Sequence, residues 1–125
     1  MSPIIFAYIG DAVFELYVRK FLITNHNLTI NELNKKAHSI VNATAQARVY
    51  NSIEHILTDA EKSIAKRARN AKKNTPKNAD MHDYNAATAL EATLGYLYLS
   101  GEHNRLDQLL DLCKTEFTRI PEDCL

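Results

Sequence analysis

The chain has 125 residues, enough for one domain whose hydrophobic core needs no disulfide or metal for support. Apolar residues make up 46% of it and charged residues 24%, which excludes a disordered or fibrous protein. The formal net charge is zero and by itself indicates no charged partner. The two cysteines, Cys113 and Cys124, do not have the spacing of metal ligands. Because Asp11, Glu15 and Arg19 interrupt the apolar N-terminal stretch, we expect no membrane span and a cytoplasmic protein.

The first half of the chain predicts three helices, and no stretch alternates convincingly as a strand would. A helix from about residue 3 to 23 begins at a proline and is apolar almost all round, which predicts that it is buried. Thr29 and Glu32 have capping-box spacing and open a second helix. A break near residues 41–42 separates it from a third helix that runs through Leu57.

The second half predicts three more helices around a basic loop. Thr58 and Glu61 form a second capping box, and the helix they open ends after about Ala71. Residues 72–78 are predicted to form the loop, because the proline within them disfavours a helix before it. Helices over 83–100 and 103–117 complete an all-α fold of about six helices, which we assign to a single domain over residues 1–125.

Two acids, Asp11 and Glu91, stand in the middle of strongly apolar helices with a glycine nearby, Gly10 and Gly95 respectively. Glycine inside a helix costs about 1 kcal/mol relative to alanine, so it usually marks a close backbone approach. If the two helices cross at these small residues, the carboxylates meet, and a divalent cation would relieve their repulsion. Two plainer alternatives stay open: Glu91 could face solvent, and Asp11 could pair with Arg19 or a lysine.

Positive charge is concentrated in one segment, since 7 of the 15 lysines and arginines lie between residues 62 and 77, where there is no acid. A solvated helix face is the plain interpretation. A second interpretation is that the segment contacts the phosphates and 2′-hydroxyls of duplex RNA, and the neutral hydrogen-bonding residues among the cations favour it. The predicted RNA contacts are Arg67, Arg69, Asn70, Lys72, Lys73, Thr75, Lys77 and Asn78.

At this point the motifs resemble a known family. Residues 8–15 (YIGDAVFE) are similar to the signature helix of the ribonuclease III domain, and residues 91–99 (EATLGYLYL) to its second catalytic helix. Residues 69–72 (RNAK) and 75–78 (TPKN) resemble the basic loop of the small bacterial branch, Mini-ribonuclease III. Members of this branch lack the double-stranded-RNA-binding domain of the larger enzymes, and we expect the same here, because the chain ends too early for that domain.

The resemblance implies an all-α endonuclease domain that cleaves double-stranded RNA as a homodimer. By motif position, Asp11 and Glu91 match the catalytic acids that bind the metal, which we expect to be Mg²⁺. Glu15 and Thr88 are candidates for acting on the ion through its waters. The chain departs from the larger enzymes at three positions where they carry acids, which here are Ile4, Ala7 and Thr88.

The resemblance further implies products with 5′-phosphate and 3′-hydroxyl ends, one cut per strand from the two subunits, and maturation of the ends of precursor 23S ribosomal RNA. One alternative is a catalytically inactive helical module that binds structured RNA, against which the retention of both acids speaks. A second alternative is a purely structural helical dimer, which would bind no duplex RNA.

Overall fold

The computed structural model describes residues 1–71 and 75–117, and within them it contains helices and no strand. This confirms the all-α prediction. Two of the predicted RNA contacts, Lys72 and Lys73, lie outside the described residues, as does Cys124. The helices are α1 (Pro3–Asn25), α2 (Ile30–Ile40), α3 (Ala43–Ile53), the short 3₁₀ helix η1 (Glu54–Ile56), α4 (Asp59–Asn70), α5 (Met81–Leu99) and α6 (His103–Phe117).

Capping side chains account for most of the boundaries. The capping boxes predicted at Thr29 and Thr58 are both present. Helix α5 begins two residues earlier than predicted, because the Asp80 carboxylate accepts a hydrogen bond from the Asp83 N–H at 2.9 Å. The third predicted helix is shorter as an α-helix, since α3 ends at Ile53 and the chain reaches Leu57 through η1.

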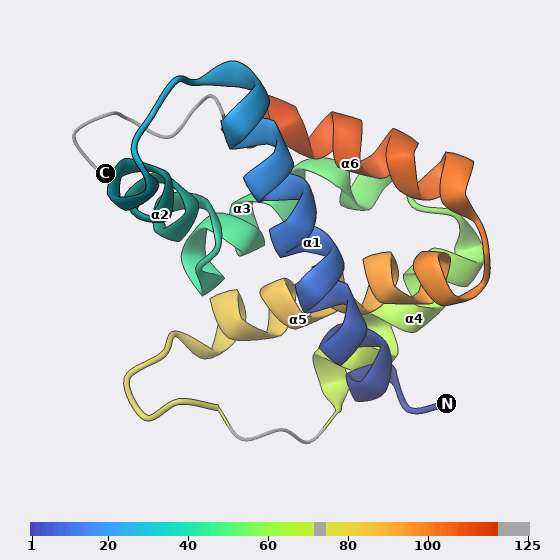
Figure 1. The fold of residues 1–125 in the computed structure, drawn as a ribbon. Coiled ribbons are helices and arrows are strands. Elements are labelled where there is room, and N and C mark those ends of the chain that lie inside the picture. The colour runs from blue at the N-terminus through green and yellow to red at the C-terminus, as the bar shows by residue number, and fades with distance from the viewer. Residues whose placement is uncertain (72–74, 118–125) are drawn as a thin grey trace.

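Helix α5 is the centre of the molecule, and α1, α3, α4 and α6 pack around it (Figure 1). Ten of its 19 residues are buried, so its sides face other helices rather than water. In Figure 1, α1 crosses in front of α5, and the described part of the loop before α5 projects away from the helices at the edge where α5 begins. Within the described part of the chain, no helix is both long and apolar enough to span a membrane.

Helices α1 and α5 cross at the two glycines, as the sequence predicts. A β-carbon on Gly10 would lie 1.7 Å from the carbonyl oxygen of Glu91, and one on Gly95 would lie 1.9 Å from the carbonyl oxygen of Phe6. Each glycine therefore rests directly on the backbone of the opposite helix. This contact sets how close Asp11, the neighbour of Gly10, comes to Glu91.

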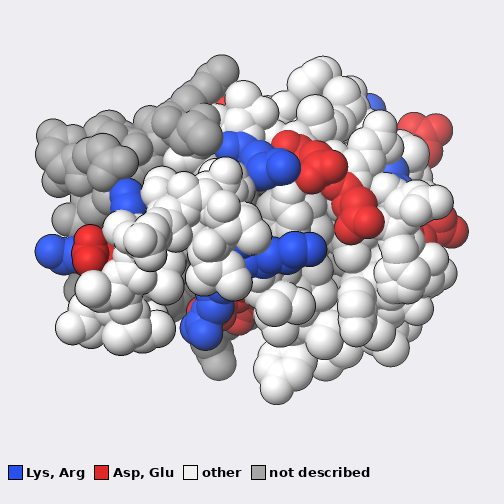
Figure 2. All heavy atoms as spheres, turned by 45° about the horizontal axis from the view of Figure 1, so that its top comes forward, with Lys and Arg blue, Asp and Glu red and all other residues white. Residues whose placement is uncertain are grey.

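The prediction that α1 is buried is wrong for one of its sides. Tyr8 is 81% exposed, and Ile5, Leu16 and Ile23 on the same side are also exposed. Their spacing places them on one stripe of the helix, opposite the buried Phe14. On the face drawn in Figure 2, residues other than lysine, arginine, aspartate and glutamate form most of the described surface. The apolar character of α1 thus serves both the core and an outer surface.

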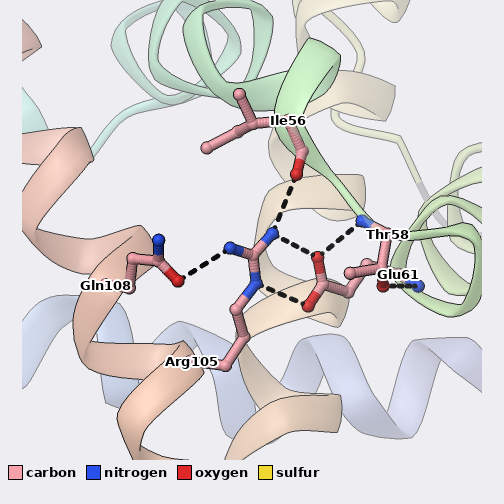
Figure 3. Close-up of polar contacts among 5 residues, drawn as sticks. All are labelled: Ile56, Thr58, Glu61, Arg105 and Gln108. Atoms are coloured by element: carbon pink, nitrogen blue, oxygen red, sulfur yellow. Dashed lines mark hydrogen bonds and ion pairs between the residues drawn. The ribbon is translucent and has the colours of Figure 1, made fainter.

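Helices α4 and α6 are joined by an ion pair between the buried Glu61 and the partly buried Arg105 (Figure 3). Two guanidinium nitrogens of Arg105 donate to the two carboxylate oxygens of Glu61, each at 2.9 Å. Arg105 also donates to the carbonyl oxygen of Ile56 and to Gln108, while the Thr58 N–H donates to Glu61 at 2.9 Å. Although burial opposes ionisation of Glu61, the hydrogen bonds from Arg105 and Thr58 hold its pKa below the ordinary value.

Candidate active site

Asp11 from α1 and Glu91 from α5 share a surface notch next to the helix crossing. The notch has a volume of about 210 Å³. Its walls come from the N-terminal halves of both helices and consist of Ile4, Ala7, Tyr8, Asp11, Tyr84, Thr88 and Glu91. The proximity of the two acids, predicted from their glycine neighbours, is confirmed.

The two carboxyl groups lie within hydrogen-bonding reach of each other, and Glu91 is strongly affected. Burial, followed by the hydrogen bond to Asp11 and repulsion from its charge, raises the pKa of Glu91 to about 8. A hydrogen bond from Gln46 acts in the opposite direction. At neutral pH the free protein therefore keeps a proton on Glu91, as expected where two carboxylates share a site without a cation.

Neither plainer alternative is seen among the described residues, because Glu91 is only partly exposed and no basic side chain forms an ion pair with Asp11. Arg19 bonds Glu15 instead of Asp11, with its Nη2 2.7 Å from Oε1 of Glu15. Among the ion pairs of the described residues, none involves Asp11 or Glu91. Glu15 itself does not line the notch, so its predicted action on the waters of an ion lacks geometric support.

The site fits a hard divalent cation. In the described part of the chain, no group of three or more histidine, cysteine, aspartate or glutamate side chains could hold a metal. Two adjacent carboxylates are nevertheless a sufficient protein contribution for Mg²⁺, which usually keeps several waters and takes one or two carboxylates. The raised pKa of Glu91, caused by burial and by the neighbouring Asp11, marks a place where a positive charge is favoured.

Three positions that carry acids in the larger enzymes, Ile4, Ala7 and Thr88, all line this notch. The acids are thus replaced on the inner wall, where apolar and small groups now stand. The Thr88 hydroxyl donates to the carbonyl oxygen of Tyr84 at 2.8 Å. Its hydrogen is therefore already engaged in a bond within α5 and is not free to bond a group in the notch. Thr88 faces the acids, but its oxygen is available only as an acceptor.

Sequence reasoning missed Gln46, Tyr8 and Tyr84 as parts of the site. Gln46 is 5% exposed and donates from Nε2 to Oε2 of Glu91 at 3.4 Å, although the two residues lie 45 positions apart in the chain. No local pattern could reveal such a contact. Tyr8 could have been found, because a residue three positions before Asp11 lies on the adjoining turn of the same helix.

The predicted RNA-contacting residues lie along the end of α4 and the loop that leads to α5. Arg67, Asn70, Lys77 and Asn78 are exposed. Thr75 is partly buried, and its hydroxyl lies 3.6 Å from the sulfur of Met81. These positions border the helix that supplies Tyr84 and Glu91 to the notch.

Arg69 differs from the other cations, because it is held against the protein. Its guanidinium lies 5.1 Å from the ring centre of Tyr50 and 3.5 Å from the Glu54 carboxylate. It helps to line an open hollow of about 350 Å³ together with Lys62 and Lys66. The cation at Arg69 is thus part of a wider basic surface on α4, whose Lys62 and Lys66 belong to the predicted basic segment but were not among the predicted RNA contacts.

Comparison with known proteins identifies the family. The ribonuclease III domain matches residues 5–102. A protein named Mini-ribonuclease 3 from a Thermoanaerobacter species is 44% identical over 113 residues, which cover 90% of this chain and 80% of that protein. Another Mini-ribonuclease 3, from Enterococcus faecalis, is 37% identical over 116 residues, covering 90% of this chain and 88% of that protein.

A solved structure agrees with these relatives. The crystal structure of a protein from Fusobacterium nucleatum superposes with a TM-score of 0.83 at 33% identity, covering 92% of this chain and 93% of the other. Enzymes of the ribonuclease III family depend on metal ions and act on double-stranded RNA. The chain belongs to the ribonuclease III family, in its small Mini-ribonuclease III branch, and is an endoribonuclease.

Proposed function

We propose that this endoribonuclease hydrolyses phosphodiester bonds of duplex RNA at the notch between α1 and α5, with Mg²⁺ as its cofactor. The observation that carries the proposal is the pairing of Asp11 and Glu91 without a basic partner among the described residues. Two carboxylates held next to each other at a helix crossing repel, which is unfavourable for stability alone, and a bound cation would offset that repulsion.

Asp11 and Glu91 would hold the ion, directly or through its waters. When bound, the ion would lower the pKa of a coordinated water and neutralise charge on the scissile phosphate. Glu91 would hold the ion in its ionised form, because only the ionised carboxylate is a ligand. The backbone contacts at Gly10 and Gly95 hold α1 and α5 at a fixed distance, so the two acids would need to move little when an ion binds.

The duplex would be bound by the basic end of α4 and the following loop. Arg67 and Lys77 are exposed cations on this surface, and Asn70 and Asn78 add neutral donors and acceptors. Such a mixture suits the phosphates and 2′-hydroxyls of an A-form helix. The loop leads directly into α5, so RNA held there is brought toward Glu91.

A homodimer joined along the exposed apolar side of α1 is part of the proposal. Ile5, Tyr8, Leu16 and Ile23 form that side, and Tyr8 also lines the notch. An exposed apolar stripe of this kind usually marks an interaction surface. Two copies joined here would place both notches next to the interface, so that each could cut one strand and leave 5′-phosphate and 3′-hydroxyl ends.

For the natural substrate, we propose the ends of precursor 23S ribosomal RNA. This assignment rests on the resemblance to the Mini-ribonuclease III branch, since no contact in the notch selects one RNA over another. Cleavage of a precursor transcript that carries these ends, compared with a duplex of unrelated sequence, tests the assignment.

The activity is tested by incubating the protein with long duplex RNA, with and without Mg²⁺, and sizing the products. Asp11→Asn and Glu91→Gln should each lower the cleavage rate by about 100- to 1,000-fold, the scale on which removal of a group central to electrostatic catalysis acts. Both variants should bind duplex RNA as the unchanged protein does. Asp107→Asn, an exposed acid on α6, serves as the control and should cleave normally. Normal turnover in either acid variant would refute the proposed site.

A further inference from the structure

A buried amide from a third helix supports one of the two acids. Gln46 lies on α3 and is 5% exposed, and its Nε2 donates to Oε2 of Glu91 at 3.4 Å. From this juxtaposition we propose that Gln46 is a positioning residue of the acid pair, orienting the Glu91 carboxylate so that it shares a cation with Asp11. The inference rests on the proposed function and names a residue that acts within the same site.

The two neighbours of Glu91 act on it in opposite ways. Asp11 repels the ionised carboxylate and would favour its rotation away from the notch, whereas the Gln46 N–H attracts it. Gln46 thus favours the orientation in which the Glu91 carboxylate stays turned toward the notch, as a shared cation requires.

An amide is well suited to this position. A lysine or arginine would also attract Glu91, but its charge would compete with the cation for the carboxylate. A glutamate would accept rather than donate when ionised and would add a third repelling charge. Glutamine donates a hydrogen bond without changing the charge of the site.

The backbone that carries Gln46 is firmly held. Its neighbours Ala45 and Ala47 are 7% and 3% exposed, and α3 packs directly against α5. The amide therefore approaches Glu91 from a fixed point rather than from a mobile loop. A fixed donor of this kind is what typically orients a metal-binding side chain, and its loss typically lowers metal affinity by about 10- to 100-fold.

The first test uses Gln46→Met, which keeps the length of the side chain and removes the N–H donor. Mn²⁺ binding to the RNA-free protein is measured by isothermal titration calorimetry, and we expect affinity to fall by about 10- to 100-fold. The Mg²⁺ concentration for half-maximal cleavage should rise by a similar factor, while duplex binding in EDTA stays unchanged. The control is Thr93→Val, a buried change on α5 whose hydroxyl bonds Ala89, and it should leave Mn²⁺ affinity unaltered.

Gln46→Glu is the second variant, isosteric with the original in case the methionine variant does not fold. Its extra charge should preserve Mn²⁺ binding, but displacement of Glu91 should lower turnover at saturating Mg²⁺ by at least 10-fold. A merely structural role of Gln46 would not separate binding from turnover in this way. Wild-type turnover in Gln46→Glu, or wild-type Mn²⁺ affinity in Gln46→Met, would overturn the positioning role while leaving the proposed function intact. Absence of both Mn²⁺ binding and cleavage in the unchanged protein would overturn both.

Discussion

Glu91 is the residue on which the notch depends most, because its surroundings make it a poor acid in the free protein. Burial and the neighbouring Asp11 raise its pKa to about 8, whereas an exposed glutamate ionises near pH 4.5. Between about pH 4.5 and 8, Glu91 therefore keeps its proton in the folded protein, whereas the same residue in the unfolded chain has released it. Stability and metal occupancy are linked through that proton.

We predict that the metal-free protein loses stability as pH rises from about 4.5 to 8. A pKa raised by folding contributes stability that is fully present below the unfolded value and is lost as pH rises toward the folded value. The slope contributed by this one group is at most about 1.4 kcal/mol per pH unit. Thermal melts in EDTA between pH 5 and 8 should show a steeper fall for the unchanged protein than for Glu91→Gln. Parallel curves would contradict the shifted pKa.

The sequence predicted the proximity of Asp11 and Glu91, because an acid surrounded by apolar residues with a helical glycine nearby is unusual, but it left open whether other groups neutralise them. It was not sufficient for Gln46, since α3 meets α5 only through the tertiary fold. Glu15 illustrates the reverse error. It stands one turn from Asp11, but Arg19 one turn further along holds it by an ion pair outside the notch.

At the scale of helices, the α1–α5 crossing determines the site. Its two glycines were recognisable in the sequence, and the capping boxes at Thr29 and Thr58 predicted where α2 and α4 begin. The 3₁₀ turn η1 was not predictable from local pattern, because part of its support comes from Arg105, which lies 49 positions further along the chain. Contacts of that range are invisible to helical periodicity.

Gly10→Ala should destabilise the protein by about 1–3 kcal/mol, because the new methyl group would overlap the Glu91 carbonyl and push α5 away. Cleavage should fall as well, since Asp11 and Glu91 would separate. Gly101→Ala is the control: Gly101 has φ of +74° with no atom within 4 Å of the added carbon, so strain of about 1 kcal/mol is expected with normal cleavage. Chemical denaturation and duplex-cleavage assays measure both effects. Equal behaviour of the two variants would argue against the crossing as the determinant.

Arg105→Met should cost about 3 kcal/mol in unfolding free energy, because it leaves the buried Glu61 carboxylate without its cation. The matched control on the same helix is Lys114→Met, which removes an exposed ion pair with Asp111 and should change stability by less than about 0.5 kcal/mol.

The same ion pair has a pH signature. The pKa of Glu61 is lowered by folding, so its contribution is present above the ordinary carboxyl range and is lost as pH falls below it. Urea denaturation at pH 7 and pH 4 should therefore show a larger loss for the unchanged protein than for Arg105→Met. A full 3 kcal/mol difference persisting at pH 3 would contradict this account.

At the scale of the whole molecule, the sequence predicted the number and order of helices but not which side of α1 is covered. An apolar stripe looks the same in a sequence whether it faces a core or a partner subunit, because both remove it from water. Only the packing of α5, α2 and α4 on the other sides of α1 shows that Tyr8, Leu16 and Ile23 remain outside.

We predict that Leu16→Glu combined with Ile23→Glu makes the protein monomeric at micromolar concentration. Two charges within the apolar stripe would have to be desolvated on association, which is unfavourable without partners. Sedimentation velocity measures the change, and cleavage by the variant should produce single-strand nicks more often than double cuts. Ile30→Glu, an exposed apolar residue on α2, should leave the assembly unaltered. A dimer that survives the double change would place the interface elsewhere.

One consequence follows from the fact that Asp11 and the exposed stripe belong to the same unbroken helix of 23 residues. In a pair of subunits joined along α1, rigid helices rather than loops would fix the distance between the two notches, and with it the offset between the cuts in the two strands. The length of the single-stranded overhang should then be a constant of the enzyme, independent of the sequence of the duplex.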